Sequence, residues 1–186
     1  MKRCLFLLLI TGMLLGCNKA DDGISAAITL RNKLLQCTEC TFETVITADY
    51  GEKIQTFSTK NKVDNTGKLE FEVVKPEEIE GITGEIAEGT GKLTFDDKVL
   101  LFELLADEQI TPVCAPWIFI STLRGGYIRS CEVLEDGYRI QMDDSYEEDA
   151  LQMDIWINED YIPIRGEILF RGRRILTLDV ENFQIV

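Results

Sequence analysis

The six residues Lys68-Leu69-Glu70-Phe71-Glu72-Val73 alternate strictly between polar and apolar side chains. Successive side chains of a strand point to opposite faces of a sheet, so this alternation predicts a strand with one buried and one solvated face. The same period of two runs from Phe42 to Tyr50. Because strands with one solvated face are typical of antiparallel sheets, the two segments predict an antiparallel sheet.

Turn signals separate further strand-like runs along the chain. They are Tyr50-Gly51, Asp64-Asn65-Thr66-Gly67, Glu88-Gly89-Thr90-Gly91, Glu135-Asp136-Gly137, Asn158-Glu159-Asp160 and Arg171-Gly172. Their spacing predicts about ten or eleven short strands joined as a meander. The expected fold class is therefore α+β, with mainly antiparallel β structure in one domain.

Two segments interrupt the strands with helical signals. Residues 24–36 place apolar side chains at helical spacing. Residues 112–124 begin with prolines, at Pro112 and Pro116, and are followed by Gly125 and Gly126, an arrangement that favours a helix. This second segment is apolar nearly all round, and such a helix must be covered on several sides. We expect it to pack on the concave face of the sheet.

The N-terminus has the features of a secretion signal. A basic start at Lys2 and Arg3 precedes an apolar run from Leu5 to Leu15, which is shorter than the ~20 residues of a membrane-spanning helix and suits a secretion signal. The sequence Leu14-Leu15-Gly16-Cys17 then resembles the bacterial lipobox. We expect residues 1–16 to be a signal peptide, Cys17 to carry the lipid, 17–23 to be a tether and 24–186 to form the domain. The protein would then be anchored to the cell membrane by lipid, facing outside the cytoplasm.

Composition excludes several kinds of function. The 186 residues include 19 Lys and Arg, 33 Asp and Glu and no His, for a net charge of −14. Without histidine there is no Ser-His-Asp triad and no histidine-ligated metal. A strongly acidic chain is not expected to bind nucleic acid, because phosphates need Lys and Arg for neutralisation. We expect no enzyme activity, no metal and no cofactor, since no nucleophile and base are placed together.

Besides Cys4 and Cys17 the chain has Cys37, Cys40, Cys114 and Cys131. Export would allow them to form disulfides, and four cysteines permit three pairings. Structural disulfides and buried free thiols both remain open. The Cys37–Cys40 pair has the spacing of a redox motif, but it closes a helix where such motifs open one.

Two charged segments could be either ordinary solvated surface or binding sites. The acidic run 143–149 lacks the alternating ligands and turn glycine of a calcium loop, so we expect a solvated loop. Arg165, Arg171, Arg173 and Arg174 gather near the C-terminus. We expect them to pair with acidic residues across strands, the alternative being a contact with a partner or a lipid headgroup.

The aromatic residues suggest a ligand site. Trp117, Phe119, Trp156 and Phe102, together with Phe71, Phe95 and Phe170, are candidates to line a groove between the sheet and the apolar helix. Such a groove either packs solid, which is the usual state of a protein core, or leaves a slot for an acyl chain.

The order of these elements resembles the LolA/LolB-like lipoprotein carriers, in the form of the GerS-like small lipoproteins of Gram-positive bacteria. The residues that carry the resemblance are Ile46-Thr47-Ala48-Asp49-Tyr50-Gly51, Phe71-Glu72-Val73-Val74-Lys75-Pro76-Glu77, Asp154-Ile155-Trp156-Ile157-Asn158, Ile162-Pro163-Ile164, Ile175-Leu176-Thr177-Leu178 and Asn182-Phe183. The resemblance implies a half-open curved sheet, or incomplete barrel, closed by helices and holding an acyl chain inside.

Two functions of different classes follow. The first is an anchored lipoprotein that binds a lipid, an acyl chain or another hydrophobic ligand on its concave face. The second is an accessory lipoprotein with a solid core that docks a membrane or envelope protein partner. An open slot beside Trp117 would favour the first function, and a continuous solid core would favour the second.

Overall fold

The computed structural model describes residues 18–51, 53–88, 90–95, 98–103, 105–106, 109–147 and 150–186, without the side chains of 18–22, 95, 102, 103, 105, 106 and 109. Its helical elements are α2 (Asn18–Gln36), α3 (Ala115–Gly125) and the short 3₁₀ turns η1 (Glu77–Ile79) and η2 (Pro112–Cys114). Its strands are β1 (Glu39–Asp49), β2 (Ile54–Asp64), β3 (Leu69–Lys75), β4 (Thr83–Ala87), β5 (Thr90–Phe95), β6 (Lys98–Glu103), β7 (Leu105–Ala106), β8 (Gln109–Ile110), β9 (Tyr127–Leu134), β10 (Gly137–Asp143), β11 (Gln152–Ile157), β12 (Pro163–Phe170) and β13 (Arg173–Ile185).

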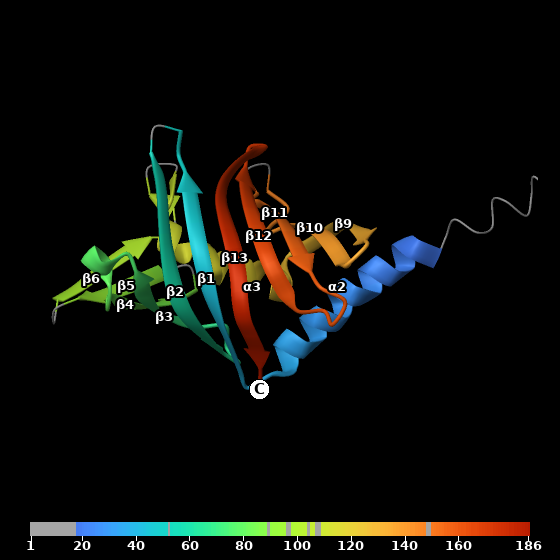
Figure 1. Cartoon of the computed structure of the whole chain (residues 1–186), viewed down its shortest axis with the longest axis horizontal. Coiled ribbons are helices and arrows are strands. Elements are labelled where there is room, and N and C mark those ends of the chain that lie inside the picture. Colours follow the sequence, from blue (N-terminus) through green and yellow to red (C-terminus); the bar gives the residue numbers. More distant parts are fainter. Residues whose placement is uncertain are drawn as a thin grey trace, which may run out of the picture.

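Eleven of the strands form one antiparallel sheet in the order β6-β5-β4-β3-β2-β1-β13-β12-β11-β10-β9. Figure 1 shows this sheet as an open, strongly curved surface, with α2 running along the side that carries β9 to β12. Its edge strands, β6 and β9, do not pair with each other, so the barrel is incomplete. The mainly antiparallel, half-open fold expected from the sequence is confirmed.

The alternation of residues 68–73 has the expected consequence. Leu69, Phe71 and Val73 are buried, whereas Glu70 and Glu72 are exposed on the other face. The register pairs Phe71 with Gly84 on β4, and the space that a side chain at Gly84 would need is occupied by the Phe71 ring. Aromatic packing over a glycine therefore fixes how β3 and β4 lie on the inner face.

A small polar network is buried on the inner face between β1 and β2. The hydroxyls of Thr44 and Thr59 lie 2.7 Å apart, and Asn61 donates from Nδ2 to Thr44 Oγ1 and to the Phe42 carbonyl. Thr59 in turn donates to Asn61 Oδ1. Because buried polar groups cost free energy unless they are paired, this network favours the observed register of β1 on β2.

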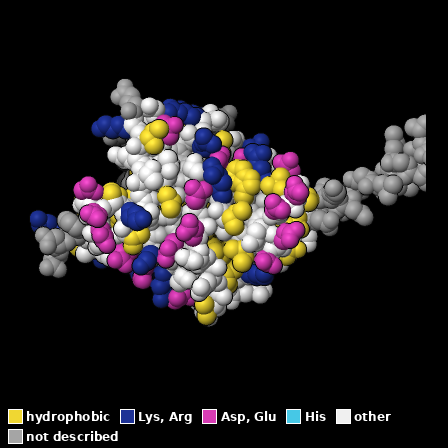
Figure 2. Space-filling model, in the orientation of Figure 1, with side chains coloured by type: hydrophobic (Ala, Val, Ile, Leu, Met, Phe, Trp, Pro, Cys, Tyr) yellow, Lys and Arg dark blue, Asp and Glu magenta, His cyan; other side chains and the backbone are white. Residues whose placement is uncertain are grey.

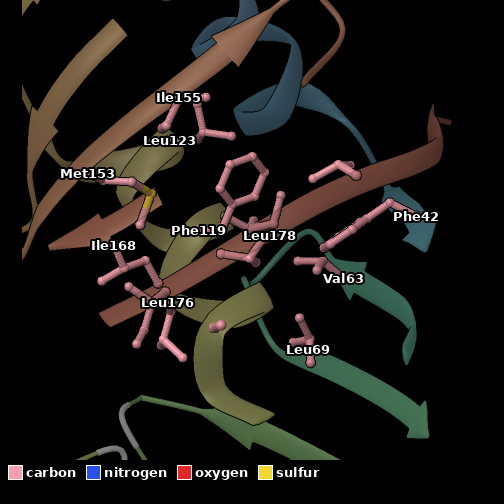
Figure 3. Packing of buried hydrophobic residues seen from close by; sticks show 14 of the residues in the cluster. Phe42, Val63, Leu69, Phe119, Leu123, Met153, Ile155, Ile168, Leu176 and Leu178 are labelled. Atoms are coloured by element: carbon pink, nitrogen blue, oxygen red, sulfur yellow. The ribbon is translucent and has the colours of Figure 1, made fainter. Parts of the chain in front are cut away.

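The apolar helix α3 lies against the concave face, as expected. Phe119 is fully buried, and Figure 3 shows its ring among buried side chains of α3 and the sheet that include Leu178 and Ile155. At Gly166 on β12, a Cβ atom would lie 2.8 Å from the Phe119 ring. The absence of a side chain at Gly166 therefore allows α3 to approach the centre of the sheet.

Helix α2 begins earlier than the sequence indicated. Residues 18–23, expected as a tether, form its first turns, while 24–36 are helical as expected. Gly23 lies directly on β9, where a Cβ atom would be 2.7 Å from the Cβ of Cys131. Cys17 lies outside the described residues, so its expected lipidation stays a prediction.

The contact between Phe119 and Gly166 can be tested by a double-mutant cycle. Gly166→Ala places a methyl group against the Phe119 ring, so we expect a loss of about 1–3 kcal/mol in the free energy of unfolding. Phe119→Leu makes room at this point, so the double variant should be more stable than the sum of the single effects predicts. Chemical denaturation measures each free energy.

The matched control is Gly125→Ala at the end of α3, where a Cβ atom would meet nothing within 4 Å. This variant should change the free energy of unfolding by no more than about 0.5 kcal/mol. Strict additivity of Gly166→Ala and Phe119→Leu would contradict the close packing of α3 on β12.

Candidate functional site

A cavity of about 490 Å³ lies beside α3. Its walls come from α3, from β8, from the loop between β10 and β11 and from the end of β12. The lining residues are Ile110, Trp117, Ile118, Ser121, Thr122, Gly125, Gly126, Asp144, Ser145, Glu147, Ala150, Leu151 and Phe170. The cavity has the volume of a small-molecule site, about 300–1,000 Å³, and large apolar side chains contribute much of its wall.

Hydrogen bonds hold α3 to the turn between β2 and β3. Trp117 donates from Nε1 to the Gly67 carbonyl at 3.2 Å. About two turns of helix further on, Arg124 donates to the carbonyls of Asp64 and Asn65, at 3.2 and 2.7 Å. The Asp64 carboxylate orders the same turn by accepting from Thr66 and from the Lys68 backbone, and these hydrogen bonds lower its pKa.

A second set of hydrogen bonds holds the C-terminal end of α3 to α2. Arg31 donates to the carbonyls of Leu123 and Gly126, at 2.9 and 2.5 Å. These carbonyls belong to the last turn of α3, where no further helical N–H is available to satisfy them. Because α3 is fixed at both of its ends, the cavity wall that it supplies is held in place.

The Tyr50 hydroxyl fixes the opposite wall. It donates to the carbonyl of Ile110, which lines the cavity on β8. Burial, with a smaller contribution from Cys114, raises the pKa of Tyr50 to about 12, so the phenol keeps its proton at neutral pH. The hydroxyl is therefore a structural donor at this position.

Two carboxyl groups of the acidic run, those of Asp144 and Glu147, line the cavity. Asp144 is exposed, and its Oδ1 accepts a hydrogen bond from the Leu151 backbone at 2.8 Å. Partial desolvation raises the pKa of Asp144 above its ordinary value, against hydrogen bonds that lower it. Residues 143–149 were expected to form a solvated loop; Asp144 and Glu147 are exposed, as expected, and also form part of the cavity rim.

Of the four expected aromatic site residues, Trp117 alone lines the cavity among the described side chains. Phe119 is fully buried in the core. Trp156 lies on the outer face of the sheet, where its ring is 5.4 Å from the Arg139 guanidinium and 5.8 Å from that of Arg165. Phe102 is part of β6, and its side chain lies outside the description.

Sequence reasoning missed the residues that complete the wall. Ile110, Ile118 and Leu151 line the cavity with Trp117, together with Phe170, which was among the aromatic candidates. The sequence could have indicated Ile118, because it belongs to the apolar helix that was expected to pack on the sheet. No local sequence pattern identifies Leu151 as a cavity residue, because it reaches the cavity only when the loop after β10 folds back on α3.

The cysteines that the structure describes are free thiols, and Cys37, Cys40 and Cys114 are buried. Burial raises the pKa of Cys40 and of Cys114 to about 12. Reactive thiols need a lowered pKa, since the thiolate is the nucleophile. The sequence left structural disulfides and buried free thiols open, and the structure has buried free thiols at Cys37, Cys40 and Cys114. Within the described ranges no group of His, Cys, Asp or Glu is arranged to hold a metal ion.

The C-terminal arginines pair across strands, as expected. Arg165 contacts Glu167 at 2.8 Å and Asp179 at 3.1 Å. Arg174 reaches the same Glu167 at 3.0 Å. Arg173 lies 3.9 Å from Asp49. The positive charge of this region is thus largely balanced on the outer face.

A wider hollow of about 740 Å³ lies over β1 to β5 and the end of β13. Its lining is dominated by charged and polar side chains such as Lys60, Glu72 and Asn182. Glu85 within it is paired with Lys92 at 3.5 Å and with Lys68 at 2.7 Å. Because this surface is polar and partly ion-paired, the smaller cavity beside Trp117 is the better candidate for a hydrophobic ligand.

No helix among the described residues has the length and apolarity needed to span a membrane.

The raised pKa of Asp144 predicts a pH dependence of stability. Its pKa is raised in the native state, so the native state binds the proton more tightly than the unfolded state does. Stability should therefore fall as the pH rises from the unfolded value of about 3.9 through the native pKa. Asp144→Asn keeps an acceptor for Leu151 and removes this loss, so it should raise the free energy of unfolding at neutral pH.

Chemical denaturation of both proteins across the acid range measures the effect. The difference between variant and parent should shrink below the unfolded pKa, where Asp144 is protonated in both states. Glu147→Gln removes one negative charge from the same loop and is the control for that change alone. A difference for Asp144→Asn that stays constant with pH would contradict the raised pKa of Asp144.

Comparison with known proteins shows likeness of structure alone. No family model matches the sequence, and no curated protein matches it. A putative outer membrane lipoprotein-sorting protein domain from Vibrio parahaemolyticus is similar, with a TM-score of 0.48, 8% identity and coverage of 89% of this chain and 92% of that one. A LolA superfamily protein from Nitrosomonas europaea has a TM-score of 0.45, 8% identity and coverage of 86% and 93%.

A chain in the structure of the CwlD amidase from Clostridioides difficile in complex with the GerS lipoprotein is also similar. Its TM-score is 0.44 at 10% identity, with 84% of this chain and 92% of that chain covered. The expected LolA-like resemblance is thus found in the arrangement of helices and strands, and identities this low extend it no further than the fold.

Proposed function

We propose that this protein is a membrane-anchored lipoprotein that binds a lipid, an acyl chain or another hydrophobic ligand in the cavity beside Trp117. The observation that carries the proposal is the cavity itself, because protein interiors are packed with few voids larger than a water molecule. Beside the cavity, Phe119 and its neighbours follow that rule and are packed closely against the sheet. A space of about 490 Å³ at the edge of this core, lined on one side by the exposed Asp144 and Glu147, is therefore a candidate for occupation.

The lining suits a ligand with an apolar body. Trp117, Ile118, Leu151 and Phe170 offer large apolar surfaces, and burying such surface is worth roughly 25 cal/mol per Å². Polar side chains such as Ser121 and Asp144 lie in the same wall and leave one part of the cavity suited to a polar end group. A few polar groups in a mostly apolar site are what fixes the orientation of a ligand.

The location follows from the sequence. A lipid on Cys17 would hold the domain at the membrane surface outside the cytoplasm, close to a supply of acyl chains. Two acyl chains on one cysteine are enough for stable anchoring, whereas one chain binds a membrane marginally. The acidic body, with a net charge of −14 for the whole chain, adds no attraction to anionic lipids.

A role without catalysis is part of the proposal. The chain has no histidine, and the pKa values of Cys40 and Cys114 are raised to about 12. Neither thiol is poised as a nucleophile at neutral pH. An accessory protein with a solid core remains the competing function, and the open space beside Trp117 favours ligand binding over it.

Two tryptophans allow a matched test, because Trp117 is on the helix that covers the concave face and Trp156 is on the outer face of the sheet. Trp117→Ala enlarges the cavity and removes its main aromatic wall, so the ligand-bound fraction should fall by more than the loss of stability explains. Trp156→Ala removes the same side chain from the outer face and should leave ligand binding unchanged. Native mass spectrometry measures the bound fraction of each folded variant. Equal occupancy in the two variants would contradict the cavity as the site.

The ligand itself can be sought in the same way. Residues 18–186, which contain every described element, are purified from a bacterial host without detergent and then incubated with envelope lipid extract. We expect a discrete added mass that dissociates as a lipid. A clean mass of the protein alone after incubation would overturn ligand binding and leave the accessory role.

A further inference from the structure

Helix α2 carries an apolar stripe that the described residues cover only in part. Ile24, Ile28 and Leu35 are 43%, 46% and 50% exposed. At 3.6 residues per turn the three positions fall within about 40° of one another around the helix axis. They therefore lie along one side of the helix, with Arg31 on the same side between Ile28 and Leu35. Figure 2 shows hydrophobic side chains gathered on the side of the molecule that carries α2.

The stripe lies beside the face by which α2 packs on the protein. Ala26, Ala27, Leu30 and Leu34 are buried, and their centre lies about 125° around the axis from the stripe, with Ala27 about 60° from Ile24. The stripe therefore widens the apolar side of the helix beyond the part that the core covers. Val133 and Leu134, on the strand that α2 contacts, are also exposed, at 38% and 37%.

The stretch of α2 that carries the exposed apolar residues has no acidic group. Residues 23–36 contain no Asp or Glu, in a chain that has 33 of them, whereas the first turns of the helix hold Asp21 and Asp22. Arg31 is held by carbonyls of α3, and Lys33 lies 5.7 Å from the Tyr161 ring. At about 100° per residue Asp21 falls about 20° from Ile28 around the axis, so the stripe side of α2 lacks the acidic groups that an anionic lipid surface repels only beyond residue 22.

The stripe also begins where the anchor would end. Ile24 is seven residues beyond Cys17, and the helix starts at Asn18, directly after that cysteine. At ~1.5 Å per helical residue, the first exposed isoleucine lies roughly 10 Å along the helix from the acylated position. Anchoring at Cys17 would hold this helix at the membrane, which raises its effective concentration there.

We propose that α2 lies along the lipid surface, with Ile24, Ile28 and Leu35 inserted into its interfacial layer. The proposal rests on the anchoring part of the proposed function. An amphipathic helix of this kind buries its apolar side shallowly at the boundary between headgroups and acyl chains. The occupant of the stripe is thus the membrane that holds the anchor.

The test uses the full chain, isolated from bacterial membranes and reconstituted in phosphatidylcholine vesicles. A polarity-sensitive fluorophore is attached at Ile28→Cys in a Cys131→Ser background, because Cys37, Cys40 and Cys114 are buried. We expect the emission to shift to the blue in vesicles and to be quenched by lipids that carry a nitroxide near the headgroup. The matched control is a probe at Gln55→Cys, an exposed position at the start of β2, which should show neither effect.

Each other outcome overturns the proposal in an identifiable way. If the protein sediments with vesicles but the probe at residue 28 stays exposed to water, the lipid anchor is supported and the docking of α2 on the membrane is contradicted. A protein that does not sediment with vesicles loses the anchor and the docking together, whereas ligand binding beside Trp117 is unaffected. A blue shift without vesicles that grows with protein concentration would assign the stripe to a second copy of this chain.

Discussion

An apolar helix that has no polar side must be enclosed, and the architecture follows from this constraint. Helix α3 buries Ile118, Phe119, Ile120 and Leu123, so that a flat sheet on one side would leave much of it in water. The curved sheet covers α3 on the concave side, and α2 with the β2–β3 turn covers it elsewhere. The cavity beside Trp117 is the region where this enclosure is left incomplete, at the end of β12 and the loop after β10.

The sequence predicted the elements better than the contacts between them. Strict alternation identified β3, and Pro112 with Gly126 delimited the segment of α3, because these signals are local. The position of Trp156 was not readable, since alternation gives the period of a strand and not which of its faces lies inward. Its neighbours Asp154 and Arg139 form a hydrogen-bonded ion pair on the outer face, and that pairing depends on the register between two strands.

The same limit applies to the candidate site. Trp117 could be proposed because a tryptophan in an apolar helix is visible in the sequence. Leu151 and Asp144 reach the cavity through a loop whose path depends on tertiary contacts. Helix α2 shows a further limit. The helical spacing of apolar residues in 24–36 predicted the helix, but it did not separate the exposed Ile24 and Ile28 from the buried Leu30 and Leu34.

The last strand in the sequence is also the one that unites the sheet. β13 lies between β1 and β12, and its register pairs Ile185 with Cys40 and Leu178 with both Ile46 and Gly166. Without it the sheet would be two separate pieces, β6 to β1 and β12 to β9. Contacts this distant along the chain form slowly, because loop closure must precede them. A chain emerging N-terminus first from a ribosome or a membrane pore can therefore join its two halves only after residues 173–185 have come out.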